Sequence, residues 1–222
     1  IYLDAVRFLQ SKGIAQKELF VGGWSQGGLN ATGLQERLEA DGIPVTATYT
    51  ASAPADPYAA LNGLLFYPRV GIDAPWVNTI MALSVFAFEN YFGPADLAKS
   101  TLDSSVYDDM KAIYERSYEG QEGLKQIMER NASRGLLEYL KPELRDPVRF
   151  GNSDYGRLLD SNETYRQTFR APVRMYFGSH DEVVKQMIGV LMAAYQAVLI
   201  GNWSDQSKSN VNPINVKGGT HR

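Results

Sequence analysis

The first fifty residues contain apolar positions at two spacings, one typical of helices and one typical of buried strands. Apolar residues recur every three to four positions in two segments, which predicts amphipathic helices. Short apolar runs, bounded by charged residues and glycine or rich in β-branched residues, predict strands of a parallel sheet. The predicted elements are a helix over residues 2–12, a strand over 19–21, a helix over 26–40 and a strand over 45–50.

The last fifty residues repeat this alternation, whereas the middle of the chain does not. A strand is predicted over 173–177, a helix from Val184 to Gly201 and a strand over 214–216. Strands that alternate with helices favour right-handed crossovers and a parallel sheet. The middle has helical windows at 78–91, 106–118, 123–131 and 134–140, and no convincing strand. We therefore expect an α/β core from residues 1–57 and 169–222, with a helical cap or lid over 58–168 inserted between the second and third strands.

Composition narrows the possible functions. The chain has 222 residues and a net charge of -3 without a basic cluster, so we expect no nucleic-acid partner. The longest apolar stretch, 74–92, is interrupted by Asn78 and Glu89, so we expect no transmembrane segment. With no cysteine and only two histidines, His180 and His221, we expect no metal site. No phosphate-binding loop is present in the sequence either, and we expect no cofactor.

The strongest chemical motif lies between the first predicted strand and the helix that follows it. The sequence Gly23-Trp24-Ser25-Gln26-Gly27 has the G-x-S-x-G pattern of a nucleophile elbow in its required strand–turn–helix context. We expect Gly23 and Gly27 to let strand and helix approach closely. The Ser25 hydroxyl would then lie at the helix N-terminus, where the backbone N–H of Gln26 is an expected oxyanion donor.

Two further motifs place an acid and a base after later strands. Asp181 follows the strand over 173–177, and His221 follows the strand over 214–216 after a glycine pair. Because parallel strands present their carboxyl ends at one edge of the sheet, Ser25, Asp181 and His221 are expected to converge there.

Together the three motifs resemble the α/β-hydrolase superfamily, in which the triad also follows the chain order Ser, Asp, His. The resemblance implies a partial α/β-hydrolase fold in which Ser25 is the nucleophile and His221 is the general base and later the general acid. It also implies that Asp181 orients the imidazole and stabilises its charged form.

Other residues compete for these roles or extend the site. Asp56, after the strand over 45–50, is an alternative acid because some members of the superfamily take the acid from that position. His180 is expected to have a surface or supporting role, and Glu182 to open the next helix. The expected substrate-binding residues are Trp24, Trp76 and Phe86.

Three functions remain open. The first is a serine esterase or lipase-like hydrolase that forms an acyl-enzyme at Ser25 and acts on a small ester with an apolar acyl group. The second is a serine peptidase of the prolyl-peptidase type that uses the same triad on short peptides; it would need acidic groups facing the pocket, with Glu89, Asp103, Asp108 and Asp109 as candidates. The third is a non-catalytic scaffold with the hydrolase shape.

The nucleophile at residue 25 leaves no room for the strands that precede it in the superfamily. We therefore expect the chain to be part of a longer enzyme, in which a missing N-terminal segment or another chain pairs with the strand Leu19–Val21. The absence of cysteine and four N-x-S/T sequences, at Asn30, Asn131, Asn162 and Asn202, slightly favour a secreted or periplasmic location over a cytoplasmic one.

Overall fold

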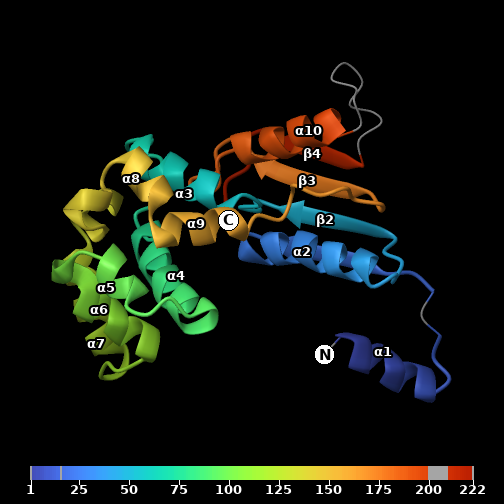
Figure 1. Ribbon diagram of the computed structural model, residues 1–222, viewed down its shortest axis with the longest axis horizontal. Coiled ribbons are helices and arrows are strands. Elements are labelled where there is room, and N and C mark those ends of the chain that lie inside the picture. The colour runs from blue at the N-terminus through green and yellow to red at the C-terminus, as the bar shows by residue number, and fades with distance from the viewer. Residues whose placement is uncertain (1, 16, 200–209, 222) are drawn as a thin grey trace.

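The computed structural model describes residues 2–15, 17–199 and 210–221, and within these ranges it contains a four-stranded parallel sheet flanked by helices (Figure 1). The strands are β1 (Phe20–Trp24), β2 (Ala47–Ala51), β3 (Val173–Gly178) and β4 (Val211–Val216). Their spatial order is β1-β2-β3-β4, and each neighbouring pair is parallel. The predicted α/β class is confirmed. The predicted helix end at Gly201 and the sequence at Asn202 lie outside the described residues.

Two helices connect neighbouring strands and cover the sheet. The connection between β1 and β2 contains α2 (Gln26–Ala40), whose buried Ala31 and Leu38 pack against Val21. The connection between β3 and β4 contains α10 (Met187–Leu199), and its Ile188 and Met192 share a core with the apolar side chains of β3. Near the N-terminus, α1 (Tyr2–Ser11) lies apart from the helices of the middle region (Figure 1).

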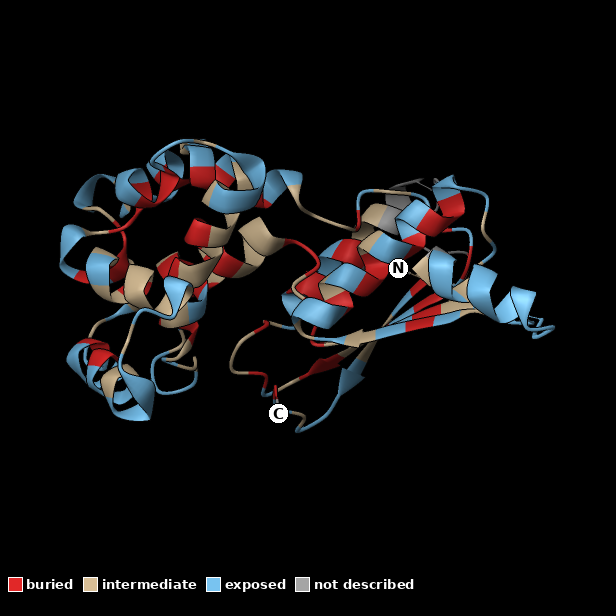
Figure 2. Ribbon diagram, turned by 90° about the horizontal axis from the view of Figure 1, so that it is seen from below, coloured by how far each residue is buried: buried red, intermediate tan, exposed pale blue. Residues whose placement is uncertain are grey.

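The connection between β2 and β3 is long and helical, and we refer to its helices α3 to α9 as the helical insertion. Its helices are α3 (Pro57–Phe66), α4 (Val77–Phe92), α5 (Leu97–Thr101), α6 (Ser104–Glu115), α7 (Gly120–Asn131), α8 (Pro147–Asn152) and α9 (Asp154–Ser161), with 3-10 turns at Leu136–Tyr139 and Pro142–Leu144. The insertion surrounds an apolar core of its own, separate from the core of the sheet (Figure 2). It was therefore correctly predicted between the second and third strands.

Several element boundaries differ from the prediction for identifiable reasons. β1 continues through both glycines to Trp24, because the sharp turn comes at Ser25 and not at the glycines. Pro213 lies inside β4, which is an edge strand of the described sheet, where a residue without an N–H is tolerated. The segment 134–140, predicted as a helix, forms only a 3-10 turn.

The helices α3, α5, α8 and α9 were not predicted; none of them is longer than ten residues, so each offers few positions in which a helical period can be recognised. Three of them begin after a side-chain N-cap: Asp56 for α3, Asp146 for α8 and Ser153 for α9. Among the described residues, no helix has both the length and the apolar character needed to cross a membrane.

Candidate active site

Ser25 occupies the sharp turn between β1 and α2. Its φ of 53° and ψ of -125° lie in a region that side-chain-bearing residues rarely adopt, which is the strain expected of a nucleophile elbow. Gly23 is required there, because a Cβ on it would lie 2.0 Å from the carbonyl oxygen of Gly27. The expectation for Gly27 was wrong: a Cβ on Gly27 would meet no atom within 4 Å, whereas one on Gly28 would lie 2.6 Å from the Cβ of Ala53.

The three residues expected to converge do so at the carboxyl ends of the strands. Nε2 of His221 lies 2.9 Å from Oγ of Ser25. Nδ1 of His221 lies 3.1 Å from each carboxylate oxygen of Asp181. His221 and Asp181 are 2% and 1% exposed, so both groups are removed from bulk water. The geometry is that of a hydroxyl–imidazole–carboxylate chain, in which the imidazole is within reach of the hydroxyl proton.

The carboxylate of Asp181 is held in its charged form despite its burial. Burial alone raises its pKa, but hydrogen bonds from His221, from the hydroxyl of Ser52 and from two backbone N–H groups outweigh burial and lower the pKa below its ordinary value. The backbone donors are Val183 and Val184, at 2.8 and 2.7 Å from Oδ1. Asp181 is therefore a buried anion facing the imidazole.

Ser52 is a member of the site that was not predicted. It is buried directly after β2, has a φ of 50°, and its N–H donates to the carbonyl oxygen of Tyr176 at 2.8 Å. Its hydroxyl supports the charged form of Asp181. The available signal was its position at the carboxyl end of a parallel strand beside β3, the same argument that identified Asp181.

The first turn of α2 presents backbone N–H groups next to Ser25. The N–H groups of Gly28 and Leu29 donate to the carbonyl oxygen of Ser25, at 2.9 and 3.3 Å. Among the described residues, none accepts a hydrogen bond from the N–H of Gln26. This N–H and the positive end of the helix dipole are placed where an anion beside Ser25 would be stabilised.

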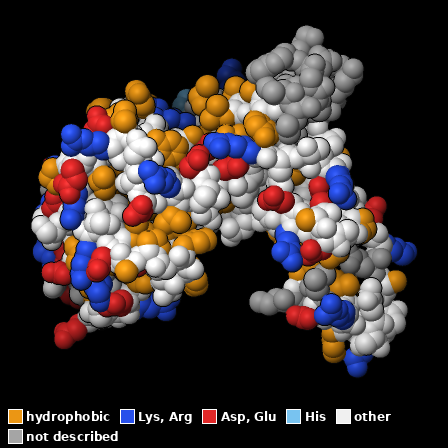
Figure 3. All heavy atoms as spheres, viewed as in Figure 1, with side chains coloured by type: hydrophobic (Ala, Val, Ile, Leu, Met, Phe, Trp, Pro, Cys, Tyr) orange, Lys and Arg blue, Asp and Glu red, His pale blue; other side chains and the backbone are white. Residues whose placement is uncertain are grey.

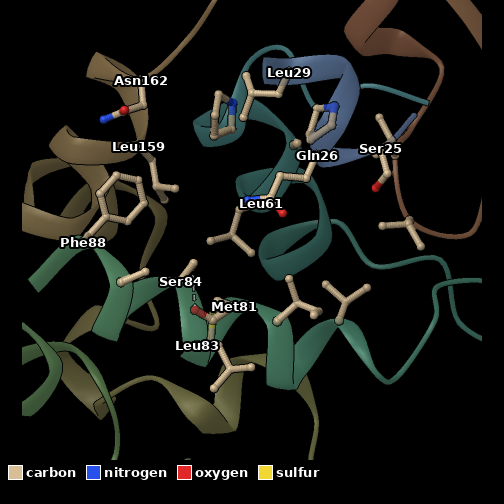
Figure 4. A pocket seen from close by; sticks show the side chains of 18 of the residues that line it. Ser25, Gln26, Leu29, Leu61, Met81, Leu83, Ser84, Phe88, Leu159 and Asn162 are labelled. Atoms are coloured by element: carbon tan, nitrogen blue, oxygen red, sulfur yellow. Dashed lines mark hydrogen bonds between the residues drawn. The ribbon is translucent and has the colours of Figure 1, made fainter. Parts of the chain in front are cut away.

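Ser25 lies at one side of a cavity of about 960 Å³ between the sheet and the helical insertion (Figure 4). The lining is mainly apolar and includes Leu61, Leu64, Ile80, Met81, Leu83 and Phe88. Leu159 and Asn162 of the insertion lie at the side away from Ser25 in Figure 4. Hydrophobic side chains also gather at the surface over α4 (Figure 3), where Ile80, Tyr91 and Phe92 are exposed.

The three predicted substrate-binding residues have different environments. Trp76 lines the cavity, and its ring centroid is 6.2 Å from that of His221. Phe86 is absent from the lining, because it is on the opposite face of α4, buried between Tyr107 and Tyr114. Trp24 is also absent from the lining, and its indole N–H donates to the carbonyl oxygen of His221 at 2.9 Å.

Asp56 is near the site but its carboxylate is directed elsewhere. One oxygen accepts from the N–H of Ala59 at the start of α3, and the other accepts from the hydroxyl of Tyr165 at 3.0 Å. The imidazole of His221 faces Asp181 and not Asp56. His180 is exposed, and its Nδ1 lies 2.9 Å from the hydroxyl oxygen of Ser179.

Glu182 does not open the next helix, which begins at Met187. The backbone after Asp181 first turns so that two N–H groups reach the Asp181 carboxylate, and this delays the helix. The carboxylate of Glu182 instead accepts from the backbone N–H of His221 at 2.9 Å.

A loop of the insertion contacts the segment that carries Asp181. The guanidinium of Arg69 donates to the carbonyl oxygen of Asp181 at 2.7 Å and pairs with Asp73. The N–H of Ala74 donates to the carbonyl oxygen of Glu182 at 2.9 Å. These contacts join the insertion to the site, and nothing in the sequence pattern indicated them.

The described part of the chain contains no candidate metal-binding site. No group of three or more His, Asp or Glu residues is close enough there to hold an ion.

Comparison with solved structures identifies the fold. The rice cell wall degrading esterase LipA from Xanthomonas oryzae has a TM-score of 0.73 at 16% identity, over 98% of this chain and 56% of that chain. A putative hydrolase from Legionella pneumophila has a TM-score of 0.73 at 16% identity, over 99% and 56%. Candida antarctica lipase A in its closed state has a TM-score of 0.60 at 14% identity, over 96% and 47%.

The sequence alone has no comparable match. No protein-family model and no curated protein matches the chain. At these low identities the likeness concerns the fold: the chain has a partial α/β-hydrolase fold and spans about half the length of the solved structures it resembles.

Proposed function

We propose that this chain carries the catalytic site of a serine hydrolase that cleaves carboxylic esters with an apolar acyl group. One observation carries the proposal: Ser25, which is linked through His221 to Asp181, lines a largely apolar cavity. An esterase and a lipase among the proteins of similar fold support ester hydrolysis as the reaction class.

In the proposed acylation, Nε2 of His221 takes the proton of the Ser25 hydroxyl while Oγ attacks the ester carbonyl carbon. The negative charge on the carbonyl oxygen is stabilised by the N–H of Gln26 at the N-terminus of α2. When the C–O bond to the alcohol breaks, His221 returns the proton to the leaving oxygen. Asp181 stabilises the imidazolium throughout, which its lowered pKa supports.

Deacylation reverses the proton transfers with water in place of the alcohol. His221 takes a proton from water, whose oxygen attacks the acyl carbon of the Ser25 ester. The proton then passes to Oγ of Ser25 as the acid leaves. Both half-reactions use the same imidazole nitrogen, which is the one 2.9 Å from Oγ.

We assign the cavity to the acyl group and residues 58–168 to the cap that covers it. Its apolar wall offers about 0.8 kcal/mol for each methylene removed from water. Trp76 and Phe88 are wall residues in this assignment, whereas Phe86 and Trp24 are not.

The peptidase alternative has no comparable support from the cavity. A free amino group of a peptide would require an acidic partner, and no acidic residue is among the described residues that line it. Of the candidates, Glu89 accepts from the N–H of Ala98, Asp103 caps α6, and Asp109 pairs with Arg130.

The outer edge of β1 is the proposed docking site of another strand, from a further segment of the protein or from another chain. β1 is an edge strand of the described sheet, and its Phe20 and Trp24 are more than half exposed. The chain also spans only about half the length of the proteins of similar fold.

The proposal is tested by p-nitrophenyl ester hydrolysis and by labelling with a fluorophosphonate. We expect the wild-type protein to hydrolyse p-nitrophenyl butyrate and to be labelled at Ser25, and Ser25→Ala to lose both, with hydrolysis reduced by about 10⁶-fold. Dipeptidyl amides tested in parallel distinguish the peptidase. A wild-type protein that is neither labelled nor active would favour the scaffold.

A further inference from the structure

We propose that Trp24 and Glu182 are positioning residues for His221: each holds one end of its peptide backbone, so that the imidazole ring bridges Ser25 and Asp181. The inference rests on the proposed function for one point only, which is that the imidazole takes part in catalysis. The contacts themselves are independent of the substrate.

The loop that carries His221 follows β4 and is tied to the loop after β3. The N–H of His180 donates to the carbonyl oxygen of Gly219 at 2.9 Å, and the N–H of Gly218 donates to the hydroxyl of Ser179 at 2.9 Å. These bonds reach Gly219, two residues before His221. The orientation of the His221 backbone therefore depends on further contacts.

Two side chains supply such contacts, one at each end of the residue. Oε2 of Glu182 accepts from the N–H of His221 at 2.9 Å. The indole N–H of Trp24 donates to the carbonyl oxygen of His221, also at 2.9 Å. With both backbone groups bound, the Cα–Cβ bond of His221 has a defined direction.

The two positioning residues are chain neighbours of the residues that His221 must reach. Trp24 precedes Ser25, and Glu182 follows Asp181. Each contact therefore links the backbone of His221 to the segment that carries either Ser25 or Asp181. The Trp24 ring also lies beside the imidazole, with centroids 5.1 Å apart, which restricts rotation of the ring.

Precise placement is needed because both nitrogens of one ring are used. Nε2 is 2.9 Å from Oγ of Ser25, and Nδ1 is 3.1 Å from both oxygens of Asp181. A displacement of about 1 Å at a reacting group lowers rates by about 10²-fold. Loss of one backbone contact is a smaller disturbance, for which we expect about a tenfold loss of kcat.

The test compares Trp24→Phe, Glu182→Ala and Glu182→Gln in the intact protein. Phe keeps an aromatic ring but has no N–H donor, and Gln keeps an oxygen acceptor but has no charge. For each variant we would measure kcat and KM for p-nitrophenyl butyrate between about pH 5 and pH 9. The ¹H NMR signal of the Nδ1 proton of His221 reports the imidazole–carboxylate contact directly.

We expect Trp24→Phe and Glu182→Ala each to lower kcat about tenfold with KM nearly unchanged, and to shift or broaden the Nδ1 proton signal. Glu182→Gln should keep the wild-type rate within about twofold and keep the signal. If Trp24→Phe does not fold, the Glu182→Ala and Glu182→Gln pair still tests the proposal through the contact at the N–H of His221.

The proposal is overturned if Trp24→Phe and Glu182→Ala retain the wild-type kcat, pH profile and Nδ1 signal. It is also overturned if Glu182→Gln is as impaired as Glu182→Ala, because the charge and not the acceptor would then matter. An inactive wild-type protein would refute the proposed function instead, and the NMR comparison would still decide the positioning role.

Discussion

Gly178 and Gly219 are packed so closely that a Cβ on Gly178 would lie 2.2 Å from the carbonyl oxygen of Gly219. Gly178 ends β3 ahead of Asp181, and Gly219 lies on the loop that carries His221. The contact is between backbone atoms, which have no flexible side chain to move aside. The loops that carry Asp181 and His221 therefore approach each other across a position where only glycine fits.

From this contact we expect Gly178→Ala to destabilise the protein by about 3 kcal/mol and to lower ester hydrolysis, because the two loops are forced apart. Urea unfolding and a p-nitrophenyl ester assay check the two effects. Gly123→Ala in α7 is the matched control: its Cβ would meet no atom closer than 3.6 Å. The free energy of unfolding of this control variant should be unchanged or higher by up to about 1 kcal/mol.

Asp181→Asn tests which carboxylate is the acid of the site. An amide beside Nδ1 favours the wrong imidazole tautomer, so we expect kcat to fall by about 10⁴-fold. Asp56→Asn should keep activity within about threefold, because the amide oxygen can still cap α3. The opposite ranking of the two variants would assign the acid to Asp56.

The lowered pKa of Asp181 also predicts a pH-dependent contribution to stability. A carboxyl whose pKa is lower in the folded than in the unfolded chain stabilises the fold above its unfolded pKa of about 3.9. This contribution is lost as the pH falls through the folded pKa. Asp181→Asn should therefore lower the free energy of unfolding by about 2 kcal/mol at neutral pH and by less in acid. Urea unfolding of the wild-type protein and of Asp181→Asn, from neutral pH down to acid, measures this difference in stability. A difference that does not change with pH would contradict the expectation.

The cavity predicts a dependence on acyl chain length that one substitution should change. Ala87 lines the cavity on α4, so Ala87→Phe would fill part of it. We expect kcat/KM for p-nitrophenyl esters with long acyl chains to fall by about tenfold or more, while that for the acetate stays within about twofold.

The neighbouring Phe86 provides the control, since it is buried in the core of the insertion and does not line the cavity. Phe86→Ala should cost about 3 kcal/mol of stability and leave the order of preference among acyl chains unchanged. A shift in preference for Phe86→Ala alone would place the acyl site elsewhere.

The sheet and the three linked residues could be predicted because each depends on local pattern and on chain order. The elbow at Ser25 and the residues Asp181 and His221 each follow a recognisable strand, and parallel strands end at one edge. Trp76 was found for a similar reason, since it precedes the apolar helix that forms a cavity wall.

The remaining features depend on the direction in which individual side chains point, and the sequence pattern does not specify it. α4 is apolar on more than one face, so its periodicity did not distinguish Phe86, which faces the core, from Phe88, which faces the cavity. The contacts of Trp24 and Glu182 with His221 span 197 and 39 residues, and no local signal indicates such pairs.

The separation of the linked residues has a consequence for how activity arises during folding. Ser25 and His221 are 196 residues apart, and β4, which leads to His221, pairs within the described sheet only with β3. A partly folded chain with β1, β2 and the insertion in place would have the Ser25 hydroxyl but not the imidazole of His221 beside it. The proposed ester hydrolysis should therefore return after denaturation only when β4 has docked, which is a non-local and intrinsically slow step.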